Sequence, residues 1–208
     1  MNQTLKLHNR HNDEWLHLTR GVKDGREVLF IEGGLPPHSD GPPMHVHVDQ
    51  DECIEVVSGR FSATENGKNV TLGPGERVVL ARGLRHRWWN AGAEPLVVKG
   101  TAEPAGDLDQ FLAGIFEIIN ASASGRPSPF YIAHLSLRHP SQRLSPAPAW
   151  VDRIVFRIIV AIGTVVGAYP ASGWPGAPST VGRGSNARAT VASRLAKSRS
   201  ACRESYPS

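Results

Sequence analysis

Closely spaced turn signals divide the first half of the 208-residue chain into short β-rich segments. The dipeptide Asn66-Gly67, with β-forming residues on both sides, is the strongest short-range signal of a tight hairpin. Turn signals that recur about every eight to twelve residues predict about eight strands, as in a β-sandwich or a β-barrel. The segments expected to be extended are 14–19, 27–32, 44–48, 52–57, 60–65, 68–72, 77–80, 86–90 and 96–101.

The hydrophobic pattern changes after Glu103-Pro104. Apolar residues then recur at helical spacing, and Asp107 stands where its side chain could cap the first helix. A polar break and a Pro-rich segment separate this helix from later apolar stretches. The expected order is a helix over 108–119, a short helix over 130–137, a loop over 140–148 and a helix over 150–169.

The chain has a formal net charge of +4, but the positive charge is concentrated near its C-terminus. Residues 171–208 contain six basic residues and one acidic residue, a balance of +5, which leaves −1 for residues 1–170. These last residues are rich in Gly, Ser, Ala, Pro and Arg without periodicity, so we expect a disordered tail. The rest of the chain gives no general case for nucleic-acid binding.

Two histidines separated by one residue begin the most informative motif of the chain. On a strand, His45 and His47 point to the same side, so both imidazoles can reach one point. On the next expected strand, Glu52 shares a face with two apolar residues, whereas Glu55 lies on the other face. If the apolar face points inward, Glu52 joins the histidines, and His86 opens a later strand that can face the same interior. Three neutral imidazoles and a carboxylate suit Fe, Mn, Ni, Co, Cu or Zn and leave room for water or substrate.

These residues resemble the two motifs of the cupin superfamily. The first motif, His-x-His, four residues, Glu, six residues and Gly, is matched by His45, His47, Glu52 and Gly59. The second motif is matched by Gly75, Gly83, His86 and Asn90. Ala81 stands where the family usually has Pro, and Ser39 where it usually has Gly, but both positions shape turns and neither supplies a ligand.

The resemblance covers about residues 25–102 and implies a mainly β fold, a double-stranded β-helix of the jelly-roll type. It also implies a metal site inside the barrel mouth, with His45, His47, Glu52 and His86 as ligands. We divide the chain into an N-terminal arm and edge strand (1–24), a cupin β-barrel (25–102), a helical extension (103–170) and a disordered basic tail (171–208).

Cupins with these four ligands include dioxygenases, oxalate-degrading enzymes and isomerases, so the fold does not fix the reaction. We favour a metal-dependent enzyme, dioxygenase-like or isomerase-like, that uses a divalent transition metal and acts on a small molecule. The alternative is a non-catalytic small-molecule-binding or sensor cupin, and the sequence leaves turnover open. It identifies no catalytic residue beyond the metal ligands.

Two side-chain groups around the second motif allow more than one role. Trp88 and Trp89 alternate, so one should line the barrel and the other its outer surface or an interface. Core packing is the simpler role, and a stacking wall for a planar substrate is the other. An arginine that reaches the barrel mouth would favour an anionic substrate; the candidates are Arg77, Arg82, Arg85 and Arg87.

The apolar stretch between Ile154 and Val166 is too short to span a bilayer, and Arg157 would be costly at the bilayer centre. We expect this helix to pack against the barrel or against a second subunit in a homodimer. An interfacial membrane helix with Trp150 and Tyr169 at its ends is the other interpretation. The N-terminal residues lack an apolar run typical of a signal peptide, so we expect a cytoplasmic protein.

Overall fold

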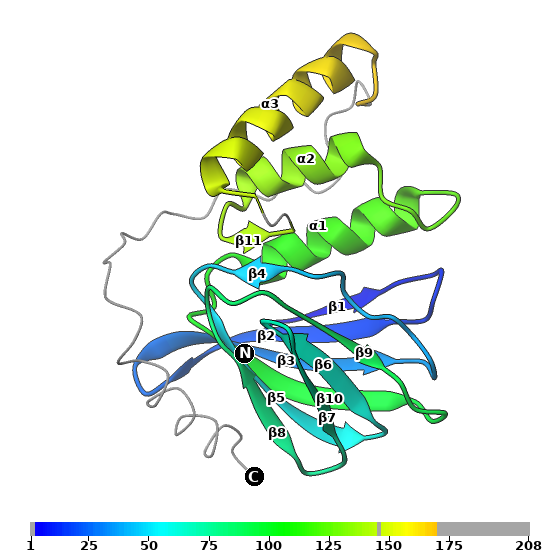
Figure 1. Ribbon diagram of the computed structural model, residues 1–208, viewed down its shortest axis with the longest axis vertical. Helices are drawn as coiled ribbons and strands as arrows, with labels where there is room; N and C mark the ends of the chain where they lie inside the picture. The colour runs from blue at the N-terminus through cyan, green and yellow to red at the C-terminus, as the bar shows by residue number, and fades with distance from the viewer. Residues whose placement is uncertain (1–2, 145–146, 170–208) are drawn as a thin grey trace.

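The computed structural model describes residues 3–144 and 147–169. Within them, strands form the first part of the chain and helices follow (Figure 1). The strands are β1 Thr4–His8, β2 Trp15–Lys23, β3 Arg26–Leu35, β4 Val46–His47, β5 Asp51–Ser58, β6 Phe61–Glu65, β7 Lys68–Leu72, β8 Arg77–Leu80, β9 His86–Asn90, β10 Leu96–Glu103 and β11 Gln142–Arg143. The helices are α1 Leu108–Ala121, α2 Pro129–Arg138 and α3 Ala149–Val165. The expected mainly β fold followed by helices is confirmed.

Two antiparallel sheets carry most of the strands. The larger sheet has the order β1-β2-β3-β10-β5-β8, and the smaller has the order β7-β6-β9. The hairpin expected at Asn66-Gly67 joins β6 to β7, where Glu65 pairs with Lys68. Both turn residues have positive φ, 47° for Asn66 and 80° for Gly67, as a type I′ turn requires.

A compact apolar core fills the space between these sheets. Phe61 of β6 is fully buried, and its ring stacks on Trp88 of β9 with 5.6 Å between ring centres. Trp89 faces outward, where the Arg87 guanidinium lies 4.8 Å from its ring centre. Trp88 therefore has the expected packing role, and strand alternation explains why its neighbour does not share it. The other buried members of this core are Leu35, Ile54, Val56, Ala63, Leu80, Leu96 and Val98.

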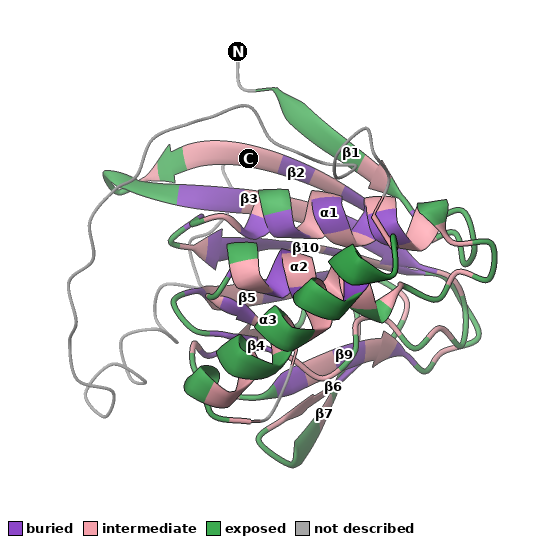
Figure 2. Ribbon diagram, turned by 90° about the horizontal axis from the view of Figure 1, so that it is seen from above, coloured by how far each residue is buried: buried purple, intermediate pink, exposed green. Residues whose placement is uncertain are grey.

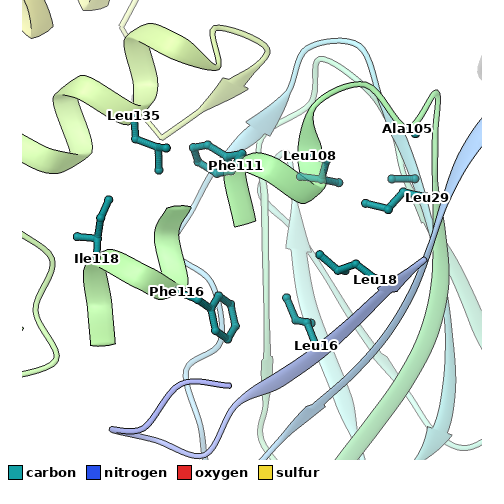
Figure 3. Close-up of a cluster of buried hydrophobic side chains, with 10 residues drawn as sticks. Leu16, Leu18, Leu29, Ala105, Leu108, Phe111, Phe116, Ile118 and Leu135 are labelled. Atoms are coloured by element: carbon teal, nitrogen blue, oxygen red, sulfur yellow. The ribbon is translucent and has the colours of Figure 1, made fainter. Parts of the chain in front are cut away.

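A second apolar cluster attaches α1 and α2 to the larger sheet (Figure 3). Its buried members are Leu16, Leu18, Leu29, Ala102, Ala105, Leu108, Phe111, Phe116, Ile118 and Leu135. An ion pair strengthens the same contact, because Arg20 of β2 donates two hydrogen bonds to the Asp109 carboxylate of α1, at 2.7 and 2.6 Å. The helices thus extend the hydrophobic core of the sheet.

Helix α3 packs on α2 and leaves much of its apolar surface exposed (Figure 2). The exposed apolar side chains are Trp150, Ile154, Val155, Ile158, Ile162 and Val165. Arg143 of β11 anchors the start of α3 through an ion pair with Asp152, at 2.8 Å. Among the described helices, none combines the length and apolar character needed to cross a membrane.

Three expectations about the second half of the chain need correction, and a fourth falls outside the described residues. The segment 140–148 is not only a loop, because Gln142 and Arg143 form β11 and pair with β4. Asp107 stands at the start of α1 but makes no capping hydrogen bond, since its carboxylate is engaged elsewhere. The last helix ends at Val165, short of the expected residue 169. The disorder expected for residues 171–208 concerns residues that are not described.

Candidate metal centre

Four side chains from three strands and one adjoining residue converge inside the barrel. His47 lies on β4, Glu52 on β5 and His86 at the start of β9, while His45 precedes β4. His45 and His86 exchange two backbone hydrogen bonds, at 2.9 and 3.0 Å, which hold the β4 segment against β9. One ligand-type atom from each side chain lies within 4.8 Å of the others.

The facing atoms of this cluster are close enough to surround a single ion. His45 Nε2 lies 3.1 Å from His47 Nε2. Glu52 places one oxygen 3.4 Å from His47 Nε2 and the other 3.6 Å from His86 Nε2. Three nitrogens and a carboxylate are a ligand set suited to divalent transition metals.

The second nitrogen of each imidazole faces a carbonyl oxygen. The distances from Nδ1 are 2.8 Å to Pro43 O for His45, 3.1 Å to Leu84 O for His86 and 2.5 Å to the Gln142 side-chain oxygen for His47. A carbonyl oxygen only accepts hydrogen bonds, so each Nδ1 carries a hydrogen and donates a hydrogen bond to the oxygen. In the neutral tautomer each Nε2 lone pair therefore points into the cluster, as metal ligation requires.

Two polar atoms at the centre of the cluster have no hydrogen-bond partner within the described residues. They are Glu52 Oε2 and His86 Nε2, and both are buried. A buried polar atom without a partner destabilises a fold by about 1–3 kcal/mol, and more when it is charged. A cation bound between these two atoms would satisfy both, so the cluster fits a metal ion.

The charges of the cluster are coupled. Burial and the neighbouring imidazoles lower the pKa of His45 to about 3, which keeps this ligand neutral at physiological pH. Burial opposes ionisation of Glu52, but the neighbouring His47 and His86 imidazoles outweigh it and hold the pKa of Glu52 well below its usual value. Burial likewise opposes protonation of His47, yet the Glu52 carboxylate outweighs it and raises the pKa of His47. The centre thus has a carboxylate anion ready to bind a cation.

The two candidate carboxylates of β5 lie on opposite faces. Glu52 joins the histidines, whereas Glu55 makes ion pairs with Arg77 at 2.6 Å and Lys99 at 3.2 Å. Strand alternation accounts for this separation. Arg82 is engaged by Asp51 at 2.6 Å, so neither Arg77 nor Arg82 is a free cation for an anionic substrate.

Two residues near the cluster have roles there that the sequence did not indicate. Gln142 contacts His47 from within the Pro-rich segment expected to be a loop, and Asp107 lies behind it. A Ser-Gln pair in such a segment has no periodicity and no motif spacing, so no sequence signal distinguishes it from a solvated loop. Only the pairing of β11 with β4 brings it to the site.

Comparison with known proteins agrees with this architecture. Residues 32–99 match the family described as Cupin domain. This part of the chain is a cupin domain. The matched segment contains His45, His47, Glu52 and His86. The fold is accordingly a mainly β cupin fold with three C-terminal helices in the described residues.

Curated relatives match the cupin part of the chain. The oxidoreductase iacF of Pestalotiopsis fici is 36% identical over 90 residues, which are 42% of this chain and 42% of the relative. The probable oxidoreductase virH of Hypocrea virens is 34% identical over 85 residues, 39% of each chain. The match therefore spans less than half the length of both relatives.

Two solved structures are similar to the chain at low identity. One is an RmlC-like cupin from Shewanella frigidimarina, 17% identical, with a TM-score of 0.41, covering 50% of this chain and 86% of that one. Another is a predicted oxalate decarboxylase from Thermotoga maritima, 20% identical, with a TM-score of 0.39, covering 49% and 91%.

Proposed function

We propose that the protein binds one divalent transition metal through His45, His47, Glu52 and His86, and that it is a metal-dependent oxidoreductase acting on a small molecule. The observation that carries the proposal is the pair of buried, unpartnered atoms Glu52 Oε2 and His86 Nε2, which face each other across 3.6 Å. The names of the two curated relatives support the reaction class. Fe, Mn, Ni, Co, Cu and Zn all suit this ligand set.

When bound, such a metal would supply Lewis-acid or redox chemistry to a small molecule. The protein's own part is to hold three imidazoles in one tautomer and to provide one negative charge. His47 and His86 are buried, and His45 and Glu52 are half-buried, so the last two mark the side from which a small molecule could approach. These imidazoles could not transfer protons to or from a substrate while a metal is bound, because both nitrogens of each would be engaged.

Because no imidazole nitrogen would be available for proton transfer, a second candidate function is also favoured. It is a cupin that binds a small molecule without turnover. With the nitrogens engaged, Glu52 is the one cluster member with an ionisable group that could exchange a proton, and it could do so only by leaving the metal. This speaks against an isomerase-like reaction that depends on an imidazole base. A thermal-shift screen would separate binding from turnover, because a merely bound ligand is recovered unchanged.

A matched pair of variants on β5 tests the proposal. Glu52→Gln removes the central negative charge, whereas Glu55→Gln makes the same change on the opposite face of the same strand. Protein is reconstituted with each of the six metals, and O₂ consumption is measured with diols and phenols. We expect Glu55→Gln to bind metal and to behave as the wild type, and Glu52→Gln to lose both binding and activity. Equal metal binding by the two variants would refute the assignment.

A further inference from the structure

The helical extension contributes a strand to the edge of the cluster. Gln142 of β11 pairs with His47, and Arg143 pairs with Val46, in antiparallel register. The contact continues beyond the paired residues, because the backbone N–H of Val48 donates to Ser141 O at 2.9 Å. The segment β4 therefore lies between His86 on one side and the extension on the other, as the position of β11 beside β4 in Figure 1 illustrates.

The side chain of Gln142 points at a proposed metal ligand. It is 2% exposed, and its oxygen accepts a hydrogen bond from His47 Nδ1 at 2.5 Å. Its amide nitrogen faces Gln50 Oε1 at 3.1 Å, Ser141 Oγ at 3.3 Å and Asp107 Oδ1 at 3.4 Å. The amide is thus enclosed by polar partners on both of its ends.

The Asp107 carboxylate fixes which way the amide faces. An ionised carboxylate only accepts hydrogen bonds, so the NH₂ end of Gln142 must face Asp107 and the oxygen must face His47. Asp107 is itself held by His139, which donates from Nδ1 to Oδ2 at 2.7 Å, and by the Ser141 hydroxyl at 3.0 Å. Burial opposes its ionisation, but these hydrogen bonds outweigh burial and lower the pKa of Asp107.

We propose that Gln142, which belongs to the helical extension, is a positioning residue of the metal centre. It fixes the ring orientation and the tautomer of His47. His45 and His86 are held by backbone carbonyls near them in sequence, whereas His47 depends on a side chain 95 residues away. Partners of this kind orient ligands and increase their basicity, and their loss typically weakens metal affinity 10–100-fold. The inference rests on the proposed metal binding and adds that the extension belongs to the site.

Three full-length variants test the role of Gln142. Gln142→Leu keeps the volume and removes the acceptor. Gln142→Glu keeps an acceptor for the Nδ1 proton of His47. The control is Arg143→Gln on the same strand, since adjacent strand residues point to opposite faces and Arg143 contacts Asp152. Circular dichroism shows whether each variant is folded. If Gln142→Leu is unfolded, Gln142→Asn replaces it in the test, because its side chain is one methylene shorter and its oxygen no longer reaches His47 Nδ1.

The first readout is Co²⁺ affinity, measured by competition with a chromophoric chelator, together with the visible spectrum of the bound ion. We expect Gln142→Leu to bind 10–100-fold more weakly with an altered spectrum. Arg143→Gln should bind within about threefold of the wild type. Gln142→Glu should bind more tightly than Gln142→Leu but more weakly than the wild type, because it keeps the acceptor for His47 and loses the NH₂ group that faces Asp107. A Gln142 that merely fills space would allow Gln142→Leu to bind normally with an unchanged spectrum, and that result would overturn the proposal.

The second readout needs no metal. Nitrogen-15 NMR of the wild type should show a slowly exchanging Nδ1–H resonance of His47, retained in Gln142→Glu and Arg143→Gln and lost in Gln142→Leu. Its absence from the wild type, or its persistence in Gln142→Leu, would overturn the role of Gln142. If the wild type binds no Co²⁺, the proposed metal binding fails, and this resonance still decides whether Gln142 holds His47.

Discussion

Replacing Asp107 by asparagine should lower the free energy of unfolding by about 1–2 kcal/mol at neutral pH. The carboxylate accepts hydrogen bonds from His139 at 2.7 Å, from Ser141 at 3.0 Å and from Gln142 at 3.4 Å. Asparagine has the same shape but one acceptor oxygen instead of two. Asparagine can keep the hydrogen bonds from Ser141 and Gln142 only if its NH₂ group turns toward His139.

The magnitude follows from the bond that changes. A hydrogen bond to a charged group stabilises by about 1.5–3 kcal/mol, and a neutral one by about 0.5–1.5 kcal/mol. If His139 changes tautomer and accepts a hydrogen bond from the new amide, a charged hydrogen bond is replaced by a neutral one. The free energy of unfolding then falls by the difference between the two, about 1–1.5 kcal/mol. If His139 keeps its tautomer, the fall is somewhat larger. The Asp107 side chain is 31% exposed, so solvent screening keeps the effect at the lower end of the range. Asp107→Ala loses all three contacts and should cost about 3 kcal/mol.

Urea unfolding of both variants and the wild type between pH 3 and pH 8 is the assay, with Asp40→Asn, an exposed site, as the control. The folded-state pKa of Asp107 is lowered from 3.8, so its contribution is present above the unfolded-state pKa and is lost as pH falls through the folded value. The gap between wild type and Asp107→Asn should be constant above about pH 5 and shrink below it. No gap at pH 7, or a gap that stays constant down to pH 3, would refute the role of the ionised carboxylate.

Three further predictions concern packing and assembly. Phe61→Ala removes a fully buried ring and should cost about 3–5 kcal/mol in urea unfolding, whereas a loss under 1 kcal/mol would contradict its place in the core. Gly100→Ala puts a Cβ 2.2 Å from the Cys53 carbonyl oxygen, so it should cost roughly 2 kcal/mol or more, and a normal melting temperature would argue against this close approach. Homodimerisation stays a prediction: Ile158→Glu, on the exposed side of α3, should shift sedimentation from dimer to monomer with stability unchanged within about 0.5 kcal/mol. An unchanged dimer would mean that this side of α3 is not the contact.

Sequence reasoning was most informative where local chemistry decides the structure. The turn at Asn66-Gly67 needs two residues that tolerate positive φ, and few other pairs do so as readily. The strict alternation of a strand separates Glu52 from Glu55 and places Trp88 inside and Trp89 outside. Strand alternation and the resemblance to the cupin motifs together pointed to the cluster residues.

What could not be predicted depends on contacts between distant segments. β11 has two residues, and it exists because its backbone pairs with β4 rather than because of any propensity of its own. Asp107 satisfies the sequence rule for a helix cap, yet three donors from the segment after α2 compete for the same carboxylate. Tertiary hydrogen bonds of this kind override local propensity. The hydrogen bond between His47 and Gln142 could therefore not be predicted from the sequence.

The direct test of the central claim is the metal content of full-length protein purified without chelators and then dialysed against each candidate metal. Elemental analysis by inductively coupled plasma mass spectrometry should find about one transition-metal ion per chain, because one cluster of this composition is present among residues 3–144 and 147–169. That ion should be lost in Glu52→Gln and retained in Glu55→Gln. Protein that contains no metal and also refuses Fe, Mn, Ni, Co, Cu and Zn at neutral pH would contradict the account.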